Sequence, residues 1–264
     1  MSRGKNSELR IPIVGKTVRL VFQGLENIGA FEAHFPPAVS CDGDDLDVRV
    51  LTRDDQPAPD MEAPIQLDGH GEYIGGLDLA CRKGWVRLTG QWPAEGLANF
   101  LRQAALRLAL RQGGAVVHGA CIVRRDEAFI FYGPSGAGKT TVCTLSDGFE
   151  VANDDLTAIL KSGERLEAWG MPRAKRFPAL SGRTGPFRIR AVFKLVQDTQ
   201  TFLEPLPAAL ALAQLAALPK QFSDGQAEQA LHVLSDMVKT VPCYALHFTK
   251  SRDFWACIET ELDK

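Results

Sequence analysis

Several features that assign a protein to a class at first sight are missing from this 264-residue sequence. No apolar run approaches the roughly 20 residues that span a bilayer, and the opening residues MSRGKNSE lack the apolar segment of a signal peptide. The six cysteines form no C-x-x-C pair and most have apolar neighbours, which favours reduced, buried thiols over a metal site. We therefore expect a cytoplasmic protein with no membrane partner.

Neither sign of charge dominates the composition. The chain has 30 Lys and Arg against 32 Asp and Glu, a net charge of -2, so no overall field attracts nucleic acid or an anionic membrane. The 45% of hydrophobic residues is typical of a globular protein, and the length allows one large domain or two smaller ones. We expect no nucleic-acid partner.

Residues 1–95 carry the alternating apolar pattern of short strands. Such runs lie near residues 18–22, 46–50, 74–79 and 85–88, and turn-forming Asp and Gly residues separate them. We predict a small, mostly antiparallel β-rich module over residues 1–95, and no residue in it suggests catalysis.

The remainder, residues 96–264, alternates between helical and strand patterns. A helix over 95–112 places its apolar residues on a single stripe and ends at a Gly-Gly pair. We further predict strands at 115–123, 128–132, 156–160, 166–169, 191–196 and 244–248, and helices at 141–145, 208–218, 227–238 and 254–262. These elements predict a second domain of α/β (α+β) class, joined to the first near residue 95.

One glycine-rich stretch fits the phosphate-binding pattern G-x-x-x-x-G-K-[ST]. It consists of Gly133, Pro134, Ser135, Gly136, Ala137, Gly138, Lys139 and Thr140, with Thr141 directly after it. A strand pattern precedes it and a short helical pattern follows, which is the context that the motif requires. Its backbone N–H groups can surround phosphate oxygens, Lys139 can reach the β- and γ-phosphates, and the Thr140 hydroxyl can bind Mg²⁺. We predict a nucleotide phosphate site here.

Two adjacent carboxylates, Asp154 and Asp155, follow Lys139 by only 15 and 16 positions. Such a pair at the end of an apolar run suits one Mg²⁺ ligand and one group for proton transfer or water orientation, although a turn or helix cap would use the same residues. In most P-loop ATPases and GTPases the acidic strand comes much later. The short spacing and the lack of a Ser-Gly-Gly-Gln-like signature argue against a transporter ATPase.

A third candidate residue, His118, lies in an apolar strand pattern. A histidine in such a run is commonly a core residue. Its strand is expected to pair with the strand that leads into the glycine-rich motif, however, and this pairing would bring His118 near the γ-phosphate.

Together these residues resemble the core of the HPr kinase/phosphorylase family. The matching pieces are His118-Gly119, the motif at 133–140 and Asn153-Asp154-Asp155, within a resemblance that runs from about residue 115 to the C-terminus. Stretches at 191–195, 204–206 and 241–246 also resemble shorter HPr-kinase-related proteins that are often associated with peptide modification. The resemblance implies a mixed-sheet P-loop kinase core of HPr kinase/carboxykinase type, shared with phosphoenolpyruvate carboxykinase, and a smaller N-terminal β-rich module.

The resemblance also implies an activity and a role for each candidate residue. It implies an ATP-dependent kinase that transfers the γ-phosphoryl group to a hydroxyl, above all a serine of a peptide or small protein. The motif would bind ATP, and Thr140 with Asp154 would hold Mg²⁺. Asp155 would take the serine proton, with His118 and Lys139 as further catalytic residues, although the two aspartates could exchange roles. The family's behaviour further suggests a homo-oligomer.

Alternative interpretations stay open at this level. The chain could be a nucleotide-binding regulatory or assembly module with little or no catalysis; a carboxykinase is less consistent with the length. The motif contacts phosphates and not the base, so the donor could be ATP, GTP or pyrophosphate. A downstream basic segment could contact the transferred phosphoryl group or form a solvated loop; its members are Arg173, Lys175, Arg176, Arg183, Arg188 and Arg190.

Overall fold

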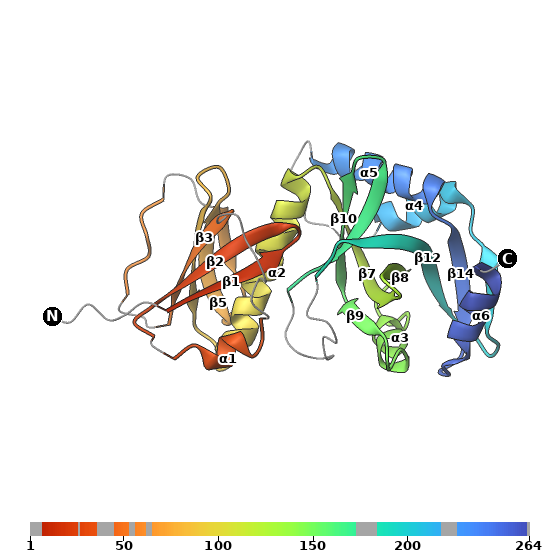
Figure 1. The fold of residues 1–264 in the computed structure, drawn as a ribbon, viewed down its shortest axis with the longest axis horizontal. Helices are drawn as coiled ribbons and strands as arrows, with labels where there is room; N and C mark the ends of the chain where they lie inside the picture. The colour runs from red at the N-terminus through yellow and green to blue at the C-terminus, as the bar shows by residue number, and fades with distance from the viewer. Residues whose placement is uncertain are drawn as a thin grey trace. The chain divides into compact units, whose positions relative to one another are not determined.

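A computed structural model describes residues 7–25, 27–35, 45–52, 56–61, 65–172, 184–217 and 226–262. These residues divide into two compact units: one holds the chain up to Leu108 together with Pro172, and the other holds the rest from Ala109. The junction lies inside helix α2 (Pro93–Arg111), whose first residues include the position near 95 where the sequence suggested a boundary. Each unit has its own sheet (Figure 1).

The first unit is built on a six-stranded sheet in the order β1-β2-β3-β6-β5-β4. Its elements are β1 (Ser7–Ile13), β2 (Lys16–Gln23), α1 (Gly29–Glu32), β3 (Leu46–Leu51), β4 (Ile65–Asp68), β5 (Tyr73–Asp78) and β6 (Lys83–Leu88). The three outer pairings are antiparallel, as predicted, but β2–β3 and β3–β6 are parallel. Parallel neighbours need long crossover connections, and the chain between β2 and β3 and between β3 and β6 supplies them.

One face of this sheet carries the core of the first unit. Val18, Leu20 and Phe22 alternate along β2 and are fully buried, because successive side chains of a strand point to opposite faces. Helix α2 contributes Phe100, whose ring meets that of Tyr73 edge to face at 5.7 Å. The predicted apolar stripe of this helix is therefore its packing face.

The second unit is built on an eight-stranded mixed sheet, with the path β11-β10-β7-β8-β12-β14-β13 and β9 paired with β7. The strands are β7 (Ala115–Arg124), β8 (Glu127–Tyr132), β9 (Glu150–Asn153), β10 (Leu156–Ser162), β11 (Arg165–Gly170), β12 (Phe187–Gln197), β13 (Phe202–Pro205) and β14 (Cys243–Phe248), and the helices are α3 (Lys139–Leu145), α4 (Ala208–Ala217), α5 (Gln226–Thr240) and α6 (Asp253–Leu262). Strands β8, β12 and β14 are mutually parallel. The prediction of an α/β protein is confirmed at this level.

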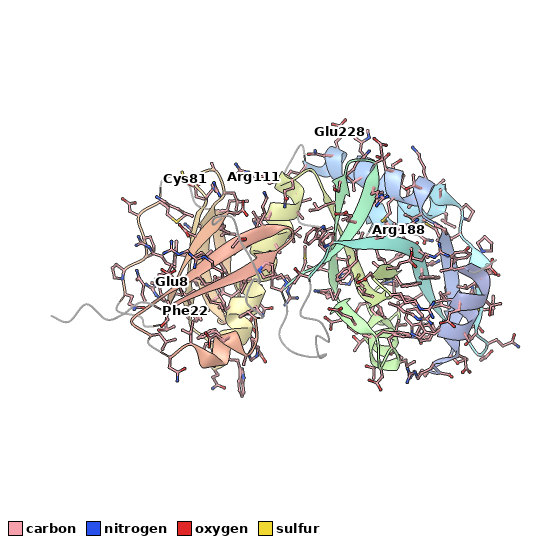
Figure 2. The ribbon with its side chains drawn as sticks, in the orientation of Figure 1. Glu8, Phe22, Cys81, Arg111, Arg188 and Glu228 are labelled. Atoms are coloured by element: carbon pink, nitrogen blue, oxygen red, sulfur yellow. The ribbon has the colours of Figure 1, made fainter. Side chains whose placement is uncertain are left out.

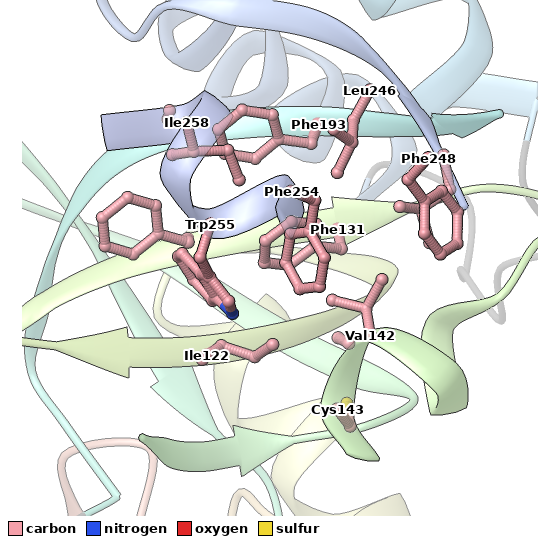
Figure 3. Packing of buried hydrophobic residues seen from close by; sticks show 14 of the residues in the cluster. Ile122, Phe131, Val142, Cys143, Phe193, Leu246, Phe248, Phe254, Trp255 and Ile258 are labelled. Carbon is pink, nitrogen blue, oxygen red and sulfur yellow. The ribbon is translucent and has the colours of Figure 1, made fainter. Parts of the chain in front are cut away.

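Aromatic packing fixes helices α3 and α6 against this sheet (Figure 3). Phe131 of β8 stacks on Phe193 of β12 with ring centroids 5.1 Å apart, and Phe254 of α6 meets Phe131 edge to face at 6.2 Å. Trp255 donates a hydrogen bond from Nε1 to the buried hydroxyl of Ser146, at the end of α3, over 2.9 Å. The short helix after the glycine-rich motif is thus anchored at its far end.

The cysteines agree in most respects with the prediction of reduced, buried thiols. Five cysteines are described and all are free thiols; Cys121, Cys143 and Cys243 are buried, Cys257 is partly buried and Cys81 is exposed. Burial raises the pKa of the Cys243 thiol to about 11, which keeps it protonated and unreactive at neutral pH. None of the described helices is long and apolar enough to cross a membrane.

Candidate active site

The glycine-rich motif forms the turn between β8 and α3. Strand β8 ends at Tyr132, and α3 begins at Lys139 directly after Gly138. Gly138 has a φ of +112°, and a Cβ atom there would lie 2.6 Å from Cζ of Phe248. Only glycine meets both conditions without strain. Strand, turn and helix therefore follow one another in the predicted order.

Lys139 is buried at the base of this turn. Its Nζ donates hydrogen bonds to the carbonyl oxygens of Gly133 at 2.8 Å and Pro134 at 3.2 Å, and only 9% of the residue is exposed. Burial lowers the pKa of this ammonium group, and the carboxylate of Asp155 opposes the shift. The cation is therefore held at the turn by backbone acceptors and an anionic neighbour.

A residue that sequence reasoning missed also holds the turn. Nε2 of Gln197, at the end of β12, donates a hydrogen bond to the carbonyl oxygen of Gly136 over 2.7 Å. The two residues are 61 positions apart, and they meet because β12 runs parallel to β8 with Lys194 opposite Tyr132. No local pattern around Gln197 predicts this contact.

His118 and Asp155 meet on the other side of the turn. Nδ1 of His118 lies 3.3 Å from Oδ1 of Asp155. Their strands explain the approach: Gly119 lies opposite Tyr132, so His118 is level with the start of the turn, and Leu156 lies opposite His118. The predicted pairing of the histidine strand with the strand that leads into the motif is confirmed.

The charges around His118 connect it to both other candidates. Burial lowers the pKa of His118, the carboxylate of Asp155 raises it, and the ammonium of Lys139 lowers it further, with a net decrease. A lowered pKa keeps the imidazole neutral at pH 7. His118, Lys139 and Asp155 thus form one electrostatic group beside the turn.

Asn153 holds the two aspartates in place. Its side-chain oxygen accepts hydrogen bonds from the backbone N–H groups of Asp155 and Leu156, both at 2.8 Å, and its Nδ2 donates to the carbonyl oxygen of Met171 at 3.0 Å. The side chain is almost fully buried. This Asx-type turn separates β9 from β10 and leaves Asp154 partly exposed within it. The sequence pattern includes Asn153 beside the aspartates, but it did not predict this role.

The predicted metal-binding oxygens are Thr140 and Asp154. Thr140 is the second residue of α3 and is exposed, and Asp154 is partly exposed after β9. Across the part of the chain that the structure describes, no group of three or more His, Cys, Asp or Glu side chains could hold a metal ion. Mg²⁺ commonly binds through one or two carboxylates with phosphate and water oxygens as its other ligands, so this donor set is compatible with it.

Two of the predicted basic residues lie at the far end of the sheet. Arg188 is opposite Glu127, at the start of β8, and is labelled in Figure 2. Nε of Arg190 lies 3.8 Å from Glu127, and its guanidinium donates to the carbonyl oxygen of Leu262 over 2.6 Å. Strand β8 separates this end from the turn by about 20 Å at 3.3 Å per residue. The other four, Arg173, Lys175, Arg176 and Arg183, lie outside the described residues.

A second polar cluster follows Gln197. Nδ1 of His247 lies 2.8 Å from Asp198, Nε2 lies 3.4 Å from Glu204, and the imidazole stacks on Phe202 at 4.2 Å. The hydrogen bond from His247 is the largest of several effects that lower the pKa of Asp198. These contacts fasten β13 to β14 and fix the turn that begins directly after Gln197.

Comparison with known proteins finds a matching family and similar solved structures. A sequence model of the family described as "SynChlorMet cassette protein ScmC" matches residues 99–263, which is more than half of the chain. Among solved structures, the Hpr(Ser) kinase/phosphatase from Coxiella burnetii is similar with a TM-score of 0.33 and 10% identity, over 56% of this chain and 99% of that one. No curated protein matches.

Proposed function

The chain belongs to the family of SynChlorMet cassette protein ScmC, and we propose that it is an ATP-dependent kinase. In this proposal it transfers the γ-phosphoryl group of ATP to a hydroxyl, most readily that of a serine in a peptide or small protein. The observation that carries the proposal is the grouping of His118, Lys139 and Asp155 around the turn at 133–138. A general base, a phosphate-binding cation and a glycine-rich turn are the parts that phosphoryl transfer requires.

The donor would bind at the turn between β8 and α3. Gly136 and Gly138 have positive φ angles, which let successive backbone N–H groups face one anion. Lys139 already points its Nζ at the backbone of the turn, where two carbonyl oxygens accept its hydrogen bonds. A triphosphate would replace these acceptors with phosphate oxygens, which bind an ammonium more strongly because they carry charge.

Mg²⁺ fits the same site through Thr140 and Asp154. A hydroxyl and a carboxylate are oxygen ligands that suit this ion; Thr140 is exposed and Asp154 is partly exposed. When bound, the ion would neutralise charge on the donor phosphates. Asn153, which fixes the turn that contains Asp154, would keep this carboxylate in position.

Asp155 would act as the base. As the serine oxygen attacks the γ-phosphorus, the bond from that phosphorus to the bridging oxygen breaks, ADP leaves and the serine proton moves to the Asp155 carboxylate. The neutral imidazole of His118 would orient this carboxylate by donating a hydrogen bond from Nδ1, across the 3.3 Å that separates them. This step uses no proton carrier beyond the residues of the site.

The test is transfer of radiolabelled phosphate from ATP to candidate peptides, to free serine and to total small proteins. We expect label on a serine, and its loss in Lys139→Ala together with loss of ATP binding. Lys161→Ala is a matched control, because this exposed lysine pairs with Asp236 and not with the turn. ATP binding without transfer to any acceptor would instead support a nucleotide-binding regulatory module. Absence of binding by ATP, GTP and pyrophosphate would overturn the nucleotide site itself.

A further inference from the structure

The sheet of the first unit has a second face, opposite the one that packs on α2. We call it the outer face; it carries Arg19 and Val21, which alternate with the buried residues of β2. The strand register extends it into two rows. Arg19 is level with Asp47 and Lys83, and Val21 is level with Arg49 and Trp85.

The outer face belongs to three parallel strands, and strands of this kind usually have both faces of their sheet covered. Strands β2, β3 and β6 are mutually parallel, and parallel sheets occur almost only where both faces are buried. Of the described residues, the segment from Gln56 to Met61 borders the outer face. Nε2 of Gln56 donates to the carbonyl oxygen of Gln23 over 2.8 Å, and the guanidinium of Arg87 donates to the carbonyl oxygen of Gln56.

Between this segment and the strands lies a groove of ≈ 430 Å³. Val21 on one side and Pro59 and Met61 on the other give it apolar walls, and Arg49 and Lys83 lie along it. A groove of this composition can bind an extended chain whose side chains are alternately apolar and charged.

The basic side chains of the groove differ in whether they have an ion-pair partner. Arg19 is neutralised, because its guanidinium lies 2.6 Å from Glu8 and 3.4 Å from Asp47. Arg49 and Lys83 are exposed, and neither side chain forms an ion pair or hydrogen bond with any residue that the structure describes. Among the described residues, the groove therefore presents two cations that lack a partner.

We propose that this groove binds an extended acidic segment of a partner protein. Carboxylates of the segment pair with Arg49 and Lys83, and an apolar side chain between them packs on Val21 and Met61. Nucleic acid fits less well, because it requires many cations to neutralise its phosphates, while Asp47 and Asp60 belong to the same lining. The proposal goes beyond the kinase activity and does not depend on nucleotide binding.

Fluorescence anisotropy of the full chain with labelled model peptides tests this. A peptide of alternating glutamate and valine should bind more tightly than its glutamine counterpart, and added salt should weaken the binding. The double variant R49E/K83E should bind the glutamate peptide about tenfold more weakly or worse, because two attractions become repulsions. It should also bind a lysine-valine peptide more tightly than the unmodified protein does.

The matched control is R165E/K239E, which reverses two exposed charges of the second unit and should leave peptide affinity unchanged. Circular dichroism checks that each variant is folded, and R49Q/K83Q replaces the reversal if that variant is not. Equal affinity for the glutamate and glutamine peptides overturns the proposal. So does a loss of affinity in the control that equals the loss in R49E/K83E, or binding of single-stranded DNA that depends equally on the two cations.

Discussion

Nδ1 of His118 lies 3.3 Å from Oδ1 of Asp155, although strand β8, the glycine-rich turn, helix α3 and strand β9 separate the two residues in the chain. The contact arises because β7 lies between β8 and β10 in the sheet. The histidine is level with the start of the turn and the aspartate directly precedes β10. The proposed base and its proposed orienting group thus lie one strand away from the proposed phosphate site.

Asp155→Asn should separate binding from transfer. The amide keeps the size of the side chain but cannot accept the serine proton, and general base catalysis typically contributes about 100-fold or more to a rate. We expect ATP affinity to change little and phosphoryl transfer to fall by about that factor. Asp147→Asn, at an exposed site just after α3, is the control and should remain active. An active Asp155→Asn enzyme would remove the proposed base.

The titration of His118 should report the charges around it. We expect a pKa below the ordinary 6.5, measured from its ring protons by NMR. Asp155→Asn should lower this pKa further, because the carboxylate favours the imidazolium, and Lys139→Ala should raise it, because a repelling cation is removed. Shifts in the opposite directions would show that the three side chains do not interact as described.

The same shift predicts how stability depends on pH. A histidine with a folded-state pKa below its unfolded value of 6.5 binds more protons when unfolded, so the free energy of unfolding falls as pH drops from about 6.5 through the folded pKa. His118→Asn should reduce this dependence in that window. Urea unfolding at several pH values measures it, with exposed His70 replaced by Asn as the control. Identical pH dependence in both variants would contradict the prediction.

Gln197→Ala should weaken nucleotide binding without unfolding the protein. It removes the hydrogen bond to the carbonyl oxygen of Gly136, and a typical net value of about 1 kcal/mol corresponds to about a fivefold loss of affinity. Gln197→Glu should lose more, because a carboxylate repels both that carbonyl and the phosphates. Isothermal titration with ATP measures both variants, and Gln200→Ala, an exposed neighbour, should match the unmodified protein. Full affinity in Gln197→Glu would disprove a positioning role.

Asn153→Ala should disturb the aspartates more than the glycine-rich turn. It leaves two partly buried N–H groups and one buried carbonyl without their partner, at a cost of about 1–3 kcal/mol for each unsatisfied group that water cannot reach. We expect lower thermal stability and a greater loss of phosphoryl transfer than of ATP affinity. Asn153→Asp keeps the acceptor oxygen and should lose less transfer. A variant that loses ATP affinity and transfer equally would point to general unfolding instead.

The longer elements were predictable because their patterns are local. Strand β8, helix α2 and the hairpin β10–β11 lie within a few residues of their predicted ranges. Strands β1, β4 and β13 were missed, and all three are edge strands; β1 and β13 also contain a proline, at Pro12 and Pro205. Proline argues against a central strand but is tolerated at an edge, where its missing N–H needs no partner. Only the sheet order shows that these strands are edges.

The candidate site shows the same division between local and distant signals. The turn at 133–138 and Lys139 were visible in the sequence, because a glycine-rich stretch that ends in Lys-Thr between a strand and a helix is typical of a phosphate site. Gln197 gave no signal, since its contact with Gly136 depends on the parallel pairing of strands far apart in the chain. Arg188 and Arg190 looked suitable by charge, yet the direction of β12 carries them to the opposite end of the sheet.

The sequence by itself determined the glycine-rich turn at Gly133 to Gly138, because the positive φ angles within it are adopted freely by glycine alone. It also determined that His118, Lys139 and Asp155 were candidates. Only the tertiary structure decided that His118 meets Asp155, that Asn153 holds the backbone of Asp155 and Gln197 that of Gly136, and that the outer face of the first sheet keeps a groove with Arg49 and Lys83. The physical reason is that strand order and register bring distant residues together, and neither is encoded in any single stretch of the chain.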